Sequence, residues 1–179
     1  MPGIAANPLP FSSSIVESFL IDGRNLVQLT NFGRRDAFGE LLSVDRRRVF
    51  FRASADPLGT NPSENCQLFS VDRFGGHLRQ ITHFEPSEGA RSEAGCALPG
   101  PPPGCDVSGL VQDPVTRTLV FYSTCDPLGR NPNGGHLFAM RPDGSGLRQL
   151  TDAPGIVTEA DGTVDTELPG PYWYSGRRD

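Results

Sequence analysis

The sequence contains no lysine, because all 16 of its basic residues are arginine. This excludes chemistry that needs a lysine amine, such as Schiff-base catalysis or the phosphate contact of a P-loop. A Gly-x-Ser-x-Gly sequence and a glycine-rich phosphate-binding sequence are also missing. The three histidines, His77, His83 and His136, and the four cysteines show no zinc-ligand spacing. We therefore expect a protein that is not an enzyme and that holds no metal and no cofactor.

The chain also has no excess of positive charge and no long apolar run. It carries 21 acidic against 16 basic residues, a formal net charge of −5. Nucleic acid is therefore not an expected partner, because binding it needs a cationic face. No segment approaches the ~20 apolar residues of a membrane span, and residues 1–14 do not resemble a signal peptide. The chain is thus expected to be either cytosolic or exported by a signal outside this sequence.

The few cysteines favour the second of these locations. Cys96 and Cys105, each preceded by glycine, flank a segment of small and proline residues that resembles a loop closed by a disulfide. Cys66 and Cys125 would then form the remaining pair, although four cysteines allow three pairings. Disulfides are favoured over free thiols here. An oxidising compartment follows, which predicts a periplasmic or secreted protein.

Glycine and proline are abundant, with 21 and 17 residues, and their frequency favours many turns and short strands. A hydrophobic share of 36% and a charged share of 21% are typical of a globular domain. Residues 1–13 are rich in proline, serine and asparagine, and we expect them to form a loose lead-in. The length of 179 residues is sufficient for one domain with a hydrophobic core.

One pattern occurs three times and organises the chain. In residues 134–151 an apolar strand, Leu137–Met140, is followed by a Pro-Asp-Gly turn and a returning strand that ends in Gln-Leu-Thr. Residues 67–82 repeat this pattern, and residues 18–30 contain a shorter copy. Each copy is predicted to be a β-hairpin. Alternation along the strands places Phe19, Phe69 and Phe138 on one face, together with Ile21, Val71 and Met140.

Two further strands precede each of the two longer hairpins. The resulting units, at about 38–82 and 107–151, each contain four antiparallel strands and are separated by an insertion at about 85–106. Repeats of this length with four strands are typical of propeller blades. The predicted fold is therefore all-β, with two complete four-stranded propeller blades and partial units at both ends of the region 14–179.

The hairpins resemble the WD-like propeller repeat of TolB-type proteins, in which an aromatic strand, Asp-Gly and Arg-Gln-Leu-Thr follow one another. Phe138–Thr151 matches closely, Phe69–Thr82 matches well, and Phe19–Thr30 has a shortened turn. The Trp-Ser-Pro-Asp-Gly that usually precedes the second strand is degraded here, to residues 42–45 and 112–114. The resemblance covers about residues 14–152.

The resemblance implies a binding scaffold rather than one activity. We expect a non-catalytic protein-interaction or ligand-binding module in an extracytoplasmic setting. Two alternatives are the propeller portion of a prolyl-oligopeptidase-like peptidase without its catalytic domain, and a structural repeat that assembles with itself. The partial terminal units predict a protein partner or self-association through the terminal blade edges. Joining the two termini would give three blades, whereas closed propellers have about four to eight, so two chains could close a ring of six.

A repeated loop offers a candidate site. Asp56-Pro-Leu-Gly-Thr-Asn61-Pro recurs as Asp126-Pro-Leu-Gly-Arg-Asn131-Pro. The aspartate and asparagine oxygens could contribute to a calcium site, or the same residues could cap their own backbone in a rigid turn. One carboxylate per loop is few for calcium, so the rigid turn is favoured. Both loops are expected on one rim, where Asp56, Asn61, Asp126 and Asn131 would shape a binding surface.

Overall fold

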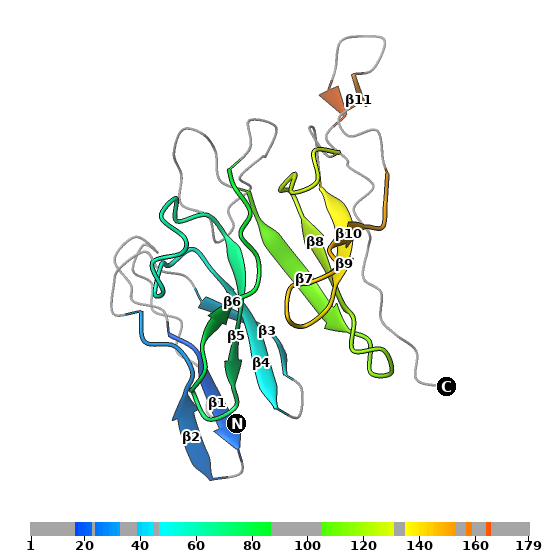
Figure 1. The fold of residues 1–179 in the computed structure, drawn as a ribbon. Helices are drawn as coiled ribbons and strands as arrows, with labels where there is room; N and C mark the ends of the chain where they lie inside the picture. The colour runs from blue at the N-terminus through cyan, green and yellow to red at the C-terminus, as the bar shows by residue number, and fades with distance from the viewer. Residues whose placement is uncertain are drawn as a thin grey trace.

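The computed structural model describes residues 17–22, 24–32, 39–44, 47–86, 105–130, 135–152, 157–158 and 164–165. Within these ranges the regular secondary structure is β-strand, and no helix occurs (Figure 1). The strands are β1 (Phe19–Asp22), β2 (Asn25–Gln28), β3 (Gly39–Val44), β4 (Arg48–Ala53), β5 (Gln67–Asp72), β6 (Arg79–Gln80), β7 (Val107–Gln112), β8 (Leu119–Ser123), β9 (His136–Met140), β10 (Arg148–Gln149), β11 (Val157–Thr158) and β12 (Val164–Asp165). The prediction of an all-β chain is confirmed.

The strands form two four-stranded sheets and two hairpins. The first sheet has the order β3-β4-β5-β6 and the second the order β7-β8-β9-β10, so that consecutive strands are neighbours. All of these pairs are antiparallel, as expected from the short connections. The strands β1 and β2 form the N-terminal hairpin, and β11 pairs with β12. Figure 1 shows the second sheet (yellow-green to yellow) beside the first (cyan to green).

The three hairpins of the repeat share one register. Phe19 lies opposite Gln28 in the N-terminal hairpin, Phe69 lies opposite Gln80 in the first sheet, and Phe138 lies opposite Gln149 in the second. The three copies can therefore be compared position by position. A residue in one copy has a structural equivalent in each of the other two.

The terminal Gln-Leu/Ile-Thr sequence of each copy closes its hairpin through side-chain hydrogen bonds. The glutamine amide donates to the carbonyl of the threonine two residues later, at 2.7 Å for Gln28, 2.8 Å for Gln80 and 2.7 Å for Gln149. The threonine Oγ1 then accepts a backbone N–H of the opposite strand. The three donors are Ser18 at 2.7 Å, Leu68 at 2.8 Å and Leu137 at 3.0 Å. These bonds satisfy backbone groups where the short strand ends.

The core lies between the layers. One apolar cluster joins the first sheet to the N-terminal hairpin, and it contains Leu29, Val49, Phe51, Ala53, Phe69 and Val71, with Leu20, Val27, Phe32 and Leu78 at its edge. A second cluster joins the first sheet to the second. It includes Phe50, Leu68, Ile81, Phe84, Val107, Leu110, Leu119, Phe121, Phe138 and Met140. The order of layers is therefore N-terminal hairpin, first sheet, second sheet.

Candidate functional site

The contact between two successive layers, called here a junction, has the same aromatic construction each time. At the first junction Phe51 and Phe69 stack with ring centroids 5.6 Å apart, and Phe32 from the preceding unit lies 6.2 Å from Phe51. At the second junction Phe121 and Phe138 are 5.9 Å apart, and Phe84 lies 6.2 Å from Phe121. Each junction thus combines a cross-strand aromatic pair with one ring from the preceding unit. Such pairs add to the free energy of apolar burial.

A glycine in the β5–β6 turn and one in the β9–β10 turn let the layers approach closely. A Cβ atom added to Gly75 would lie 2.6 Å from the backbone oxygen of Gln28, and one added to Gly144 would lie 2.7 Å from that of Ile81. Both glycines also have positive φ, +86° and +89°. A side chain at either position would therefore strain the turn and push the preceding layer away.

An ion pair adds a polar contact to the second junction. The guanidinium of Arg52 in β4 contacts both carboxylate oxygens of Asp106, at 2.9 and 2.8 Å, and donates to the carbonyl of Val107 at 3.1 Å. Both side chains are mostly buried. This contact fixes the beginning of β7 against the first sheet.

The two ends of the stack expose residues whose equivalents are buried inside it. On the N-terminal hairpin Phe19 is 48% exposed, Ile21 74% and Leu26 66%, whereas the residues equivalent to Phe19 and Ile21, which are Phe69, Phe138, Val71 and Met140, are buried. We call Phe19, Ile21 and Leu26 the N-terminal end face. They lie opposite the hairpin side that carries Leu20 and Val27, which pack on the first sheet.

The far side of the second sheet shows the same effect. Leu29 and Ile81 are 4% and 8% exposed because each packs into the following layer, but their equivalent Leu150 is 46% exposed. Val111, which pairs with Val120, is exposed as well. We call Val111 and Leu150 the C-terminal end face.

The repeated loops bind their own backbone. The carboxylate of Asp56 accepts the N–H of Asn61 at 2.7 Å, and that of Asp126 accepts the N–H of Arg130 at 2.7 Å. Asn61 is buried, and its amide donates to the carbonyls of Ser54, Ala55 and Asn65. This is the arrangement of a rigid turn. Within the described ranges no cluster of three His, Cys, Asp or Glu side chains suits a metal ion.

The binding surface predicted on these loops stays a prediction. Asn131 lies outside the described residues, so the four loop residues cannot be compared as a group. The Asn61 side chain lies inside the loop, whereas Asp56 and Asp126 are only partly buried. The aspartates are thus the loop residues nearer to solvent.

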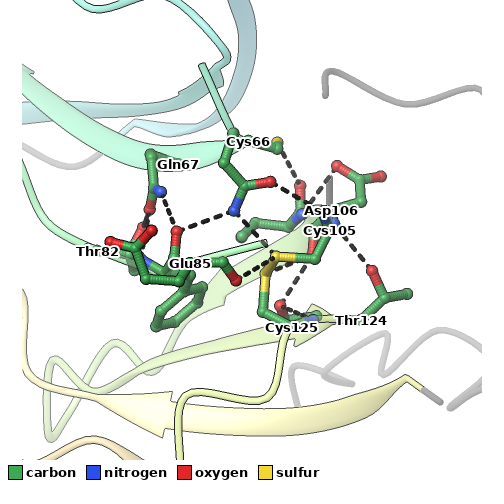
Figure 2. Close-up of a disulfide and its surroundings, with 12 residues drawn as sticks. Cys66, Gln67, Thr82, Glu85, Cys105, Asp106, Thr124 and Cys125 are labelled. Carbon is green, nitrogen blue, oxygen red and sulfur yellow. Dashed lines mark hydrogen bonds between the residues drawn. A yellow bond between two sulfur atoms is a disulfide. The ribbon is translucent and has the colours of Figure 1, made fainter. Parts of the chain in front are cut away.

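The cysteine pairing expected from the sequence is wrong. Cys105 is bonded to Cys125, as Figure 2 shows, and Cys66 is also disulfide-bonded. Cys105 lies two residues before the Val107 end of β7 and Cys125 lies two residues after the Ser123 end of β8. Because Val107 pairs with Ser123, the two cysteines are adjacent at the end of one antiparallel pair, with Cα atoms 4.9 Å apart. Cys96, the expected partner of Cys105, lies outside the described residues.

A buried polar network surrounds this disulfide. The Asn65 side chain accepts the N–H of Cys105 at 2.8 Å and donates to the Phe84 carbonyl at 2.9 Å. The Gln67 side chain donates to the same carbonyl at 2.6 Å and accepts from the Thr82 hydroxyl at 2.8 Å (Figure 2). These bonds connect the β4–β5 loop to the segment that begins the second sheet. Their buried polar atoms are paired, which gives the network a structural role.

The histidines take different parts in the structure. His136 is buried and is the equivalent of Gln67, and its Nδ1 lies 3.0 Å from the hydroxyl of Thr151. His77 is exposed in the β5–β6 turn, where its Nδ1 lies 2.8 Å from the carboxylate of Asp72. His83 is exposed. The structure does not bring the side chains of His77, His83 and His136 together at one site.

Three turn aspartates have lowered pKa values. The pKa of Asp72 lies below its ordinary value of 3.8, mainly through the contact with His77 and then through the N–H of Gly76. The N–H groups of Thr116 and Val115 lower the pKa of Asp113. The N–H and hydroxyl of Ser145 lower that of Asp143. Each carboxylate thus stabilises its turn in the charged form.

Two of the junction residues have no counterpart in the sequence-based prediction. Phe32 and Phe84 follow the repeated threonine by two positions, in Thr-Asn-Phe and Thr-His-Phe. This Thr-x-Phe spacing is a signal that the hairpin pattern, which stops at the threonine, does not include. Leu150 and Ile21 belong to the repeat, but their exposure follows only from the order of the layers.

Comparisons with known proteins add no relative. The chain matches no protein-family model, no curated protein and no solved structure. In the part of the chain that the structure describes, no helix has the length and apolar character needed to cross a membrane.

Proposed function

We propose that the chain is a non-catalytic protein-interaction module built from blades of the β-propeller type, similar to the TolB repeat. The two four-stranded antiparallel sheets and the face-to-face junctions support this proposal. The approach of β3 to β7 supports it too, because these are the first strands of their sheets. In a propeller the first strands of successive blades converge on the central axis.

The exposed end faces carry the proposal of an interaction role. Phe19, Ile21 and Leu26 form one apolar group on the N-terminal hairpin, and Val111 and Leu150 are exposed near the two edges of the second sheet. The equivalents of Phe19, Ile21 and Leu150 at the internal junctions are buried. Grouped apolar side chains on a surface mark sites where another protein binds. The site of interaction is therefore the two ends of the stack, and the rim loops would add only secondary contacts.

We also propose an extracytoplasmic location, periplasmic or secreted. The Cys105–Cys125 disulfide and the disulfide-bonded state of Cys66 support this. Structural disulfides form and persist in oxidising compartments. Reducing conditions should therefore weaken the second junction, where both Cys105 and Cys125 lie within the apolar cluster.

Site-specific photo-crosslinking tests the interaction role. A benzophenone amino acid would replace Ile21, Leu150 or Val115, one at a time, in the full chain. Val115 is the matched control, because it is an exposed apolar residue in the β7–β8 turn and lies on neither end face. In extracts of the cells that produce the protein, we expect light-dependent crosslinks from positions 21 and 150 and background levels from 115. Crosslinks identified by mass spectrometry equally from all three positions, or from none, would contradict the proposal.

A further inference from the structure

The structure also indicates what covers the two end faces. We propose that the C-terminal end face binds the N-terminal end face of a second copy of this chain, in a head-to-tail contact. This inference rests on the proposed interaction role of the end faces and names the partner. The argument uses the equivalence of positions in the three hairpins of the repeat.

The C-terminal end face corresponds to the outgoing half of a junction, meaning the side of a layer that packs into the following layer. Leu29 on the N-terminal hairpin is buried against the first sheet, and Ile81 on the first sheet is buried against the second. Leu150 is the third member of this series, and its backbone N–H donates to Leu137 just as that of Ile81 donates to Leu68. In both internal cases the covering layer presents an aromatic side of a hairpin of the same repeat. By equivalence, Leu150 is therefore expected to pack against the aromatic side of another hairpin of this repeat.

The N-terminal end face corresponds to the incoming half of a junction, meaning the side of a layer that packs against the layer before it. Phe69 and Val71 are the residues that the first sheet presents to the layer before it, and Phe138 and Met140 are those of the second sheet. Phe19 and Ile21 are their equivalents and remain exposed. Each copy of the chain thus carries one incoming and one outgoing half of the same apolar contact.

A second copy is the partner that fits both halves at once. Contact between unlike faces of identical chains is heterologous, and it closes into a ring or continues as an open chain according to the rotation per copy. At the internal junctions Leu29 and Ile81 already pack in the same apolar clusters as Phe69 and Phe138 of the following sheets. A head-to-tail contact would repeat this packing between two molecules.

The test is the absolute mass in solution, by light scattering, of the full oxidised chain and of three variants. For the wild type we expect a mass above the 19.3 kDa monomer. Ile21→Glu and Leu150→Glu should each weaken association at least ~100-fold, because an unpaired carboxylate would be buried in the contact. Val115→Glu, in a turn away from both faces, should leave the mass unchanged. Circular dichroism and thermal unfolding check that all variants fold.

Mixing the two blocked variants tests the head-to-tail geometry. Ile21→Glu retains an intact C-terminal end face and Leu150→Glu retains an intact N-terminal end face. An equal mixture should therefore recover one contact and form a dimer, although each variant alone is monomeric. A contact between like faces would instead let one of the variants dimerise alone. That result, or a mixture no heavier than its components, would overturn the proposal.

Failure of the head-to-tail contact can be distinguished from failure of the proposed interaction role. A wild type of 19.3 kDa at all concentrations, combined with crosslinks from positions 21 and 150 to a different protein, would overturn the second copy as partner and leave the interaction module intact. A monomer without such crosslinks would overturn both. Crosslinks from position 21 of one copy to the strand β9 or β10 of another would support both.

Discussion

Thr82 binds Leu68 through a buried hydrogen bond, in which the backbone N–H of Leu68 donates to the threonine Oγ1 at 2.8 Å. The same threonine hydroxyl donates to the Gln67 side chain at 2.8 Å. Thr30 and Thr151 accept the equivalent N–H groups of Ser18 and Leu137. The threonine that ends each copy of the repeat is therefore part of the structure that closes the hairpin.

Replacing this threonine should be destabilising. Thr82→Val keeps the shape but leaves the N–H of Leu68 and the side-chain Oε1 of Gln67 with fewer partners, so we expect a loss of about 1–3 kcal/mol. Urea unfolding measures this loss. Ser63→Ala is the control, because Ser63 is exposed, and surface changes stay within about 0.5 kcal/mol. Equal effects of the two variants would show that the hairpin closure adds nothing.

Aromatic truncation should depend on the position of the layer. Phe69→Ala and Phe138→Ala should each cost about 3–5 kcal/mol, because both rings are fully buried in junctions. The equivalent change Phe19→Ala should cost under about 1 kcal/mol, since that ring is on the exposed end face. The Leu150→Glu background keeps the chain monomeric during these unfolding measurements. Similar losses at all three positions would contradict the order of layers.

The repeat could be predicted from the sequence because its signal is local. Alternating apolar residues, a glycine turn and a terminal Gln-Leu/Ile-Thr all lie within one hairpin, and strand pairing follows from short connections. The cross-strand pairs Phe69–Gln80 and Phe138–Gln149 also lie within single hairpins. The all-β fold with antiparallel sheets followed directly.

The cysteine pairing and the junction contacts could not be predicted in this way. Cys105 and Cys125 become neighbours only through the register of β7 with β8, whereas Cys96 is nearer to Cys105 in sequence. Arg52 and Asp106 are 54 residues apart and meet only when the two sheets stack. Such contacts depend on how the layers pack, which the local sequence of a single segment does not determine.

Releasing one cysteine should identify its partner. In Cys105→Ser the thiol of Cys125 becomes free, so alkylation of the unreduced, unfolded protein should label Cys125. Labelling of Cys96 instead would restore the pairing expected from the sequence. Loss of the 20-residue loop closure should also lower the stability by about 3 kcal/mol. The wild type, treated in the same way, should show no reactive thiol.

Acid should destabilise the turns. The pKa values of Asp72, Asp113 and Asp143 are lowered from 3.8 in the folded chain. Such carboxylates contribute stability above pH 3.8, and this contribution is lost as the pH falls through their lowered folded pKa values. Denaturant unfolding at several pH values below 3.8 should therefore show a falling stability. Asp143→Asn, which cannot titrate, should lose less than the wild type between neutral and acidic pH, and an equal loss would contradict the role of this carboxylate.

The central claim is that the described N-terminal hairpin and two sheets are a stack of equivalent units, and that the second sheet presents an unfilled junction at Leu150. Urea unfolding of Leu29→Ala, Ile81→Ala and Leu150→Ala, in the Ile21→Glu background that blocks association, tests it most directly. We predict losses of about 2–5 kcal/mol for Leu29 and Ile81, which are buried between layers, and under about 1 kcal/mol for Leu150. A loss at Leu150 as large as that at Ile81 would mean that the C-terminal end face is already covered within a single chain, and the claim would be wrong.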